Sequence, residues 1–150
     1  MSTTPTNPLL ADGLPAFASI RPEHCQPAIE ALIERYQAFI DRVGHTPAEK
    51  IDFDGVVWQE SQHAQALANA WSTIGHVQRV NNTAEWRGAF QACLPLISAF
   101  ATERNQHPAL YQAYQALAER GDFEDQPVAV QTAINHQLRD FRLAGVDQPS

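Results

Sequence analysis

Histidines and carboxylates are the side chains in this sequence that could hold a metal ion. No histidine lies in an HExxH motif, beside a CxxC pair or at a zinc-finger spacing. The nearest to a metal motif is Glu60 with His63, the i, i+3 pair that carboxylate-bridged di-iron bundles use twice. The chain has no second E-x-x-H. Because ionisable side chains are mostly exposed, we predict that both residues lie on a solvated helix face. The six histidines are His24, His45, His63, His76, His107 and His136.

A second cluster, Glu23, His24 and Cys25, stands among the prolines of LPAFASIRPEHCQPAI, residues 14–29. In the first turn of a helix, successive side chains fan out by about 100° each, so these three cannot converge on one ion. A His24–Cys25 nucleophile pair fails for the same reason. We interpret Glu23 as favouring the helix N-terminus, His24 as a cap or a contact to the leader, and Cys25 as a small hydrophobic residue. Cys93 is too distant for a CxxC pairing, so we expect both thiols to be reduced.

Other catalytic motifs are missing from the sequence. Ser61, Ser72 and Ser98 lie in helical patterns without a G-x-S-x-G elbow, and the 7 glycines form no phosphate-binding loop. The tryptophans Trp58, Trp71 and Trp86 fall at helical spacing, which indicates a core more often than a ligand pocket. We therefore predict no catalytic, cofactor-binding or metal-binding residue in this chain.

The charge balance restricts the partners of the chain. Its formal net charge is -7, and its 10 Lys and Arg residues are spread along the sequence, which disfavours nucleic acid and anionic membrane as partners. The N-terminus lacks a basic region followed by an apolar run, and no stretch reaches the ~18 apolar residues of a spanning helix. With 44% hydrophobic and 18% charged residues, we expect a soluble folded protein in the cytoplasm.

The apolar residues of the chain recur at helical spacing, so helices are the elements that we expect to position these residues. Apolar residues at i, i+4, i+5 and i+8 predict a first helix from Pro22 to the stop at Gly44. A second begins near Asp52 or Asp54 and runs through Trp71. We expect it to break or bend within residues 72–82, where Ser72, Thr73 and Gly75 weaken a helix and Asn81 and Asn82 suit a turn.

Three further helices are predicted after residue 82. The first begins with Asn82 or Thr83 as its cap, and Pro95 kinks it or divides it in two. The next starts at Pro108, with Arg120 in its last turn and Gly121 after it. The last has Asp125 as a candidate cap and ends at Gly145. No alternating strand is visible, so we predict an all-α protein with about five helices. The expected organisation is an extended Pro-rich leader (1–20), a single helical domain (21–146) and a tail (147–150).

Several stretches together resemble one protein family. They occur in the family's order along the chain: NPLL (7–10), LPAF (14–17), IRPEHCQPAI (20–29), WSTIGHVQRVNNTAEWRGAFQACLPLISAF (71–100), LYQAYQAL (110–117) and AVQTAINHQLRDFRLAGV (129–146). The sequence is similar to the N-terminal region of the oligopeptidase A and thimet oligopeptidase family of zinc metallopeptidases, in its bacterial branch.

The resemblance implies a largely helical parent enzyme whose deep channel admits short peptides. In that family, two histidines of HExxH and a downstream glutamate hold zinc, and the motif's own glutamate activates water. No HExxH occurs here, so the resemblance carries no catalytic or metal role to any residue from 1 to 150. It implies that the leader with Pro22, Glu23 and His24 anchors the start of the chain to the helical body.

Three hypotheses for the function remain open at this point. The first is a non-catalytic N-terminal domain of an oligopeptidase. Its partner is then the remainder of a longer peptidase chain, and only the full-length form binds zinc and short peptides. The second is a stand-alone helical module, descended from that domain, which binds a protein partner. The third is peptide binding without catalysis, which half of a channel supports poorly. An apolar uncovered face favours the first hypothesis, and a charged face favours the second.

Overall fold

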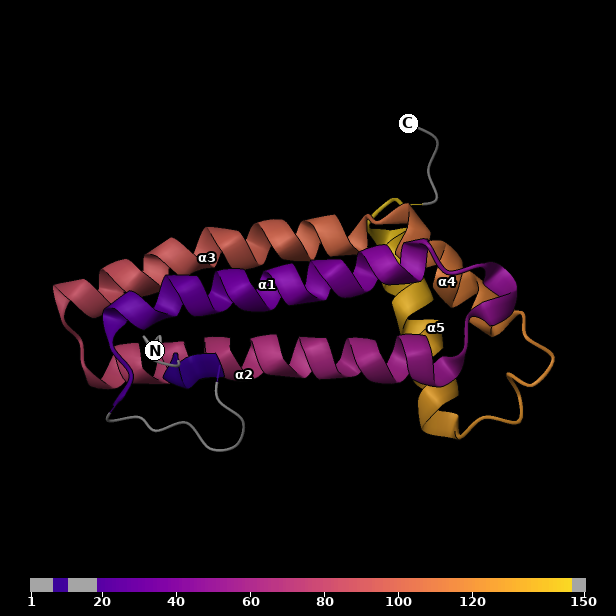
Figure 1. Ribbon diagram of the computed structural model, residues 1–150, viewed down its shortest axis with the longest axis horizontal. Helices are drawn as coiled ribbons and strands as arrows, with labels where there is room; N and C mark the ends of the chain where they lie inside the picture. The colour runs from indigo at the N-terminus through magenta and orange to yellow at the C-terminus, as the bar shows by residue number, and fades with distance from the viewer. Residues whose placement is uncertain (1–6, 11–18, 147–150) are drawn as a thin grey trace, which may run out of the picture. The chain divides into compact units, whose positions relative to one another are not determined.

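The computed structural model describes residues 7–10 and 19–146, and within these ranges it contains helices and no strand. The prediction of an all-α protein with about five helices is confirmed (Figure 1). The α-helices are α1 (Pro22–Gly44), α2 (Gln59–Val80), α3 (Ala84–Asn105), α4 (Pro108–Ala118) and α5 (Val128–Leu143). Shorter helical turns are η1 (Pro8–Leu10), η3 (Ala48–Lys50) and the π-helical η4 (Asp54–Trp58).

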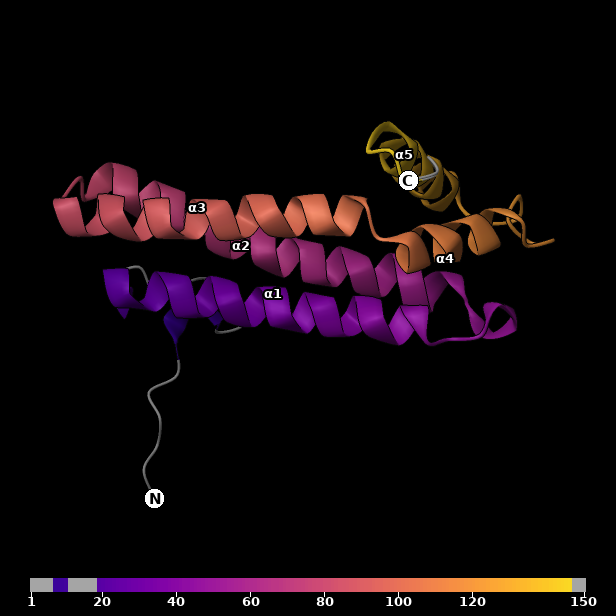
Figure 2. The same cartoon turned by 90° about the horizontal axis from the view of Figure 1, so that it is seen from above.

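The chain forms two compact units, each built from segments distant in sequence. The first unit is Met1–Arg35 with His63–Ala99, and the second is Tyr36–Gln62 with Phe100–Ser150. In the first unit, α1, α2 and α3 run side by side (Figures 1 and 2). The division into leader, single helical domain and tail stays a prediction. The tail and most of the leader lie outside the described residues, and Pro8–Leu10 form a 3-10 turn within the leader.

The core of the first unit collects apolar side chains from all three of its helices and from the leader. Trp71 of α2 stacks on Phe90 of α3, with ring centroids 4.6 Å apart. Trp86 is buried, as predicted, whereas Trp58 in the second unit is 61% exposed, so its assignment to a core was wrong. The buried set is Leu9, Ile20, Cys25, Ala28, Ile29, Leu32, Ala70, Ile74, Val77, Trp86 and Cys93.

The start of α1 is fixed by side chains that cap it. The backbone N–H of Arg21 donates to Nδ1 of His24 at 3.0 Å, so His24, at the third helical position, satisfies the N–H that precedes the helix. Asn7 donates from its amide to the carbonyl oxygen of His24 at 2.9 Å and accepts from the Leu9 N–H at 3.0 Å. His24 therefore caps the helix and contacts the leader, as the sequence predicted.

Helix α2 does not break where the sequence predicted. It is continuous from Gln59 to Val80 and ends at the predicted Asn81 turn. Ile74 and Val77 are buried on one face of this stretch, and burying such a face outweighs a few tenths of a kcal/mol of weaker helix propensity. The Asp52 carboxylate accepts the N–H of Gly55 ahead of α2, so Asp52 is the capping residue of the two candidates.

Helix α3 runs through Pro95 as one helix, so the division in two is ruled out. Pro95 is exposed, and water can therefore reach the carbonyl that proline leaves without a partner. The Thr83 hydroxyl accepts the N–H of Trp86 at 3.2 Å, which makes Thr83 the cap. Asn82 instead accepts from the Arg87 guanidinium at 2.7 Å.

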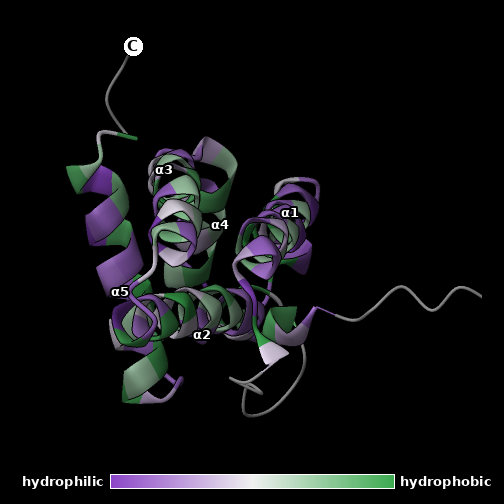
Figure 3. Ribbon diagram, turned by 90° about the vertical axis from the view of Figure 1, so that its left-hand side faces the viewer, coloured by the Kyte–Doolittle hydropathy of each residue, from purple (hydrophilic) through white to green (hydrophobic). Residues whose placement is uncertain are grey.

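In the second unit, α5 packs on α4 and crosses its direction (Figures 1 and 2). Asp125 is not the cap of α5, because turns through residues 122–126 delay the helix until Val128, with Pro127 at the N-cap position. The helix ends at Leu143, and Gly145 follows as the predicted terminator, with a φ of 85° that suits glycine. The Val146 N–H reaches the Phe141 carbonyl at 3.1 Å, which closes a Schellman motif. Polar and apolar segments alternate along α5 (Figure 3), as its amphipathic sequence requires.

Candidate functional site

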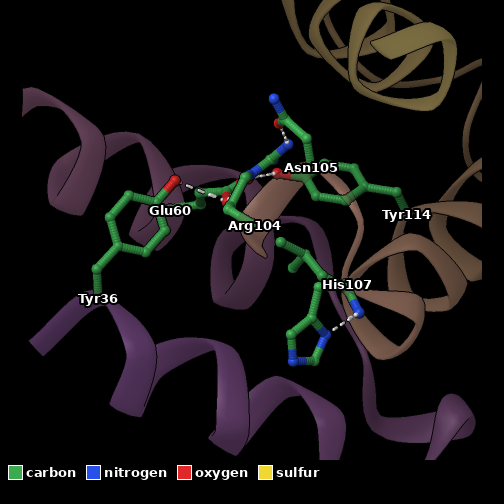
Figure 4. Close-up of polar contacts among 7 residues, drawn as sticks. Tyr36, Glu60, Arg104, Asn105, His107 and Tyr114 are labelled. Carbon is green, nitrogen blue, oxygen red and sulfur yellow. Dashed lines mark hydrogen bonds and ion pairs between the residues drawn. The ribbon is translucent and has the colours of Figure 1, made fainter. Parts of the chain in front are cut away.

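A polar cluster in the second unit contains Glu60 and Arg104, the buried charged residues of the described part of the chain. It consists of Tyr36 of α1, Glu60 of α2, Arg104 of α3 and Tyr114 of α4, and we call it the Glu60 cluster (Figure 4). Glu60 is 4% exposed. The prediction of a solvated helix face was therefore wrong for Glu60.

Hydrogen bonds saturate the Glu60 carboxylate. Arg104 donates two parallel hydrogen bonds to it, from Nη2 to Oε1 at 2.6 Å and from Nε to Oε2 at 2.9 Å. The Tyr36 hydroxyl donates to Oε2 at 2.8 Å, and the Tyr114 hydroxyl donates to Oε1. Each carboxylate oxygen thus accepts two hydrogen bonds, which is the capacity of its lone pairs.

Aromatic rings and the ion pair shape the electrostatics of the cluster. The Arg104 guanidinium lies over the Phe141 ring of α5 at 4.7 Å from its centroid, a cation–π arrangement. Burial acts to lower the pKa of Arg104, but the hydrogen bonds and charge of Glu60 outweigh it and raise the pKa. Burial, followed by the charge of Glu60, raises the pKa of Tyr36 and Tyr114, so both phenols remain protonated donors at neutral pH.

This geometry makes the Glu60 cluster a structural element. A general base needs a free lone pair within reach of the proton it removes, and a metal ligand needs one directed at the ion. Glu60 has neither, because four hydrogen bonds from Arg104, Tyr36 and Tyr114 occupy both oxygens. The cluster ties α1, α2, α3 and α4 together inside the second unit, and replacing any partner leaves a buried polar group unsatisfied.

The histidines do not assemble a metal site in the described residues, where no group of three or more His, Cys, Asp or Glu side chains could hold an ion. His63 is half-buried. His24 and His107 accept backbone N–H groups as caps of α1 and α4. Nδ1 of His45 lies 2.7 Å from the Asp41 carbonyl oxygen.

The two cysteines lie fully buried in the first unit. Burial raises the pKa of Cys25 to about 12, with smaller contributions from Cys93 and Glu23. Burial, with the charge of Glu30, raises the pKa of Cys93 to about 11. Because the thiolate is the nucleophile and both groups stay as thiols at pH 7, neither cysteine suits covalent catalysis.

A shallow hollow of about 140 Å³ lies in the second unit. Buried Val43, Ile51 and Val56 line it together with the cations Arg42 and Lys50. Small-molecule sites usually occupy about 300–1,000 Å³, so this hollow is too small for a peptide segment. The remaining lining residues are Thr46, Asp52, Gly55 and Gln59.

Residues 29–148 match the family model of the neurolysin/thimet oligopeptidase N-terminal domain. The chain belongs to this family. It is 39% identical over 142 residues to oligopeptidase A of Haemophilus influenzae, covering 94% of this chain and 21% of the relative. It is 32% identical to oligopeptidase A of Salmonella typhimurium, over 96% of this chain and 21% of the relative. A probable cytosolic oligopeptidase A of Arabidopsis thaliana is 26% identical, over 96% of this chain and 20% of the relative.

The chain thus spans about a fifth of the length of the curated relatives it matches. The family resemblance inferred from the sequence is confirmed, and the matched segment is the N-terminal domain of that family. Among the described residues, no helix is long and apolar enough to cross a membrane.

Proposed function

We propose that the chain is a non-catalytic N-terminal domain of an oligopeptidase A-type enzyme whose full-length form uses zinc to hydrolyse short peptides. The observation that carries the proposal is the match to the family's N-terminal domain model over residues 29–148. The side chains described here supply no ligand set for the zinc. Glu60 is saturated, His24 and His107 cap helices, and the thiols stay protonated.

The role that fits the structure is mechanical. The saturated Glu60 cluster and the capped helices give a self-contained scaffold, which suits a domain that supports an active site built by other residues. We propose the cytoplasm as its compartment, because buried cysteines kept as thiols suit a reducing environment. The word cytosolic in the name of the Arabidopsis relative agrees with this location.

The test measures zinc and peptide cleavage in the same preparation. We expect the purified 150-residue chain to bind no stoichiometric zinc by elemental analysis and to leave a quenched fluorescent peptide uncut. Full-length oligopeptidase A of Haemophilus influenzae serves as the positive control. Stoichiometric zinc together with chelator-sensitive cleavage by the chain would contradict the proposal.

A further inference from the structure

The exposed sides of α2 and α3 in the first unit carry no formal charge over long stretches. No Asp, Glu, Lys or Arg occurs from Ser61 to Gln78 or from Gly88 to Thr102. We call one part of this surface the α2–α3 face. Its residues are all exposed, and they are Ala64, Ala68 and Ser72 on α2 and Gln91, Leu94 and Pro95 on α3.

The α2–α3 face is continuous because its two helices touch. The half-buried rings of Trp71 and Phe90 stack between them, and a Cβ on Gly75 would lie 3.8 Å from the Phe90 ring. The i, i+4 spacing of Ala64, Ala68 and Ser72 places them in one row of α2. The half-exposed aromatic pair and Leu94, which is 45% exposed, thus lie in a surface of small uncharged side chains.

Such a surface is suited to burial by another protein segment. The buried centre of a stable interface is depleted of charged residues and enriched in aromatic ones. Alanine loses no side-chain rotamer entropy on burial, which lowers the cost of covering it. In the same unit, the exposed side of α1 is charged, with Glu23, Glu30, Glu34 and Arg35. Exposed charge in the first unit thus lies on α1 and near the α2–α3 turn, at Arg79, Glu85 and Arg87, and is absent from the residues of the α2–α3 face.

Gly88 gives a second and independent indication that another protein segment covers this surface. It lies inside α3, where glycine is less stable than alanine by roughly 0.5–1 kcal/mol. Among the described residues, a Cβ there would meet no atom within 4 Å apart from its chain neighbours and its own helix backbone, so their packing does not explain the glycine. Gly88, Gln91 and Pro95 share one side of the helix by their i, i+3, i+7 spacing. Glycine at such a position permits another backbone to approach closely.

The relatives indicate what covers this surface. The matched segment is 21% of the Haemophilus oligopeptidase A, so roughly four fifths of that chain lies outside the match. A covalently joined segment reaches a neighbouring face at a high effective concentration, so a modest uncharged surface is enough to hold it. We propose that the α2–α3 face docks the catalytic remainder of an oligopeptidase A-type chain through an uncharged surface on that remainder. This inference rests on the proposed function.

The test compares thiol accessibility in two settings. Single cysteines replace Ala68 or Gln91 on the α2–α3 face, and a matched control replaces Glu34 on α1 with cysteine. Each variant is made in the 150-residue chain and in a chimera in which this chain replaces the matched segment of the Haemophilus relative. Both proteins without the introduced cysteine serve as blanks. We expect alkylation in the chimera to be at least about ten-fold slower for Ala68→Cys and Gln91→Cys and unchanged for Glu34→Cys, because burial excludes the reagent.

Each outcome decides between the docking proposal and the proposed function. Equal alkylation rates in the two settings would overturn the docking proposal. So would protection in the 150-residue chain that rises with its concentration, since a second copy would then be the occupant.

Peptide hydrolysis by the chimera is measured in parallel. A folded chimera that protects the face but cleaves nothing would contradict the proposed function alone, and an active chimera with an accessible face would contradict the docking alone. A chimera that does not fold would contradict both, since an equivalent domain would support the remainder.

Discussion

Glu60 accepts hydrogen bonds from three side chains, and it is the buried carboxylate that pairs with the Arg104 guanidinium. We expect Glu60→Ala to lower the free energy of unfolding by about 3–5 kcal/mol, because it leaves an uncompensated buried charge. Urea denaturation measures the loss. The matched control is Glu103→Gln at the neighbouring exposed position, where contacts with Gln37 are 3.4 Å long and we expect a change within about 0.5 kcal/mol. A loss below about 1 kcal/mol for Glu60→Ala would show that the cluster contributes little.

The buried thiols and phenols make stability depend on alkaline pH. Folding raises the pKa of Cys93 from 9.0 to about 11, of Cys25 from 9.0 to about 12, and of Tyr114 above its ordinary 10.0. Below pH 9 both states hold these protons, and the stabilisation is fully present. Above pH 9 the unfolded chain releases protons that the folded chain keeps, so stability falls as pH rises.

We therefore expect the free energy of unfolding to be flat near neutrality and to decline steadily from pH 9 to 11. Urea titrations at intervals across this range measure the decline. Tyr114→Phe should make it shallower above pH 10, because one of the responsible protons is removed. A free energy that stays constant to pH 11 would contradict the assigned burial of these groups.

At the scale of elements, Gly88 inside α3 and Gly145 just after α5 provide a matched pair of substitutions. Gly145→Ala forces a side chain into a backbone with φ of 85°, and we expect it to destabilise the chain by about 1–2 kcal/mol. Gly88→Ala adds a methyl group where, apart from its own helix backbone and chain neighbours, no atom of the described residues lies within 4 Å, and we expect it to stabilise the chain by about 0.5–1 kcal/mol. Thermal unfolding of both variants beside the parent chain measures the two signs. If both substitutions changed the stability in the same direction, local backbone geometry would not determine their effects.

The elements were predictable wherever one local pattern decided them. The apolar spacing of α1, the Asp52 cap and the Gly145 stop all follow from residues within a few positions of one another. The predicted break in α2 failed because burial of Ile74 and Val77 is a tertiary effect that propensity does not include. The Asp125 cap failed because successive turns hold residues 122–126 outside α5.

The Glu60 cluster was missed because its partners are far apart in sequence. The separations from Glu60 are 24, 44 and 54 residues for Tyr36, Arg104 and Tyr114. A signal was present in the sequence. Glu60 lies four residues after buried Val56, and Arg104 lies four residues after buried Phe100, so each charge continues an apolar stripe. Opposite charges on two apolar stripes indicate a buried ion pair, whereas general exposure statistics favour the surface.

At the scale of the whole molecule, the sequence motifs identified the protein family, but they did not indicate a catalytic reaction. The quoted motifs run from residue 7 to residue 146, and the match to the Haemophilus oligopeptidase A covers 94% of the chain. Composition and spacing alone indicated only a helical protein without an active-site motif. Among the described residues, His24 and His107 cap helices, and Glu60 pairs with Arg104 in the buried Glu60 cluster.

The long sequence separations within the Glu60 cluster also determine when it can form. Its hydrogen bonds require segments of α1, α2, α3 and α4 in place together, so they are absent while helices are still pairing. We expect the cluster to act as a barrier to unfolding, with Tyr114→Phe raising the unfolding rate several-fold while the folding rate stays nearly constant. Stopped-flow measurements of both rates against urea concentration test this expectation. A folding rate that slows as much as unfolding accelerates would place the cluster in the folding nucleus.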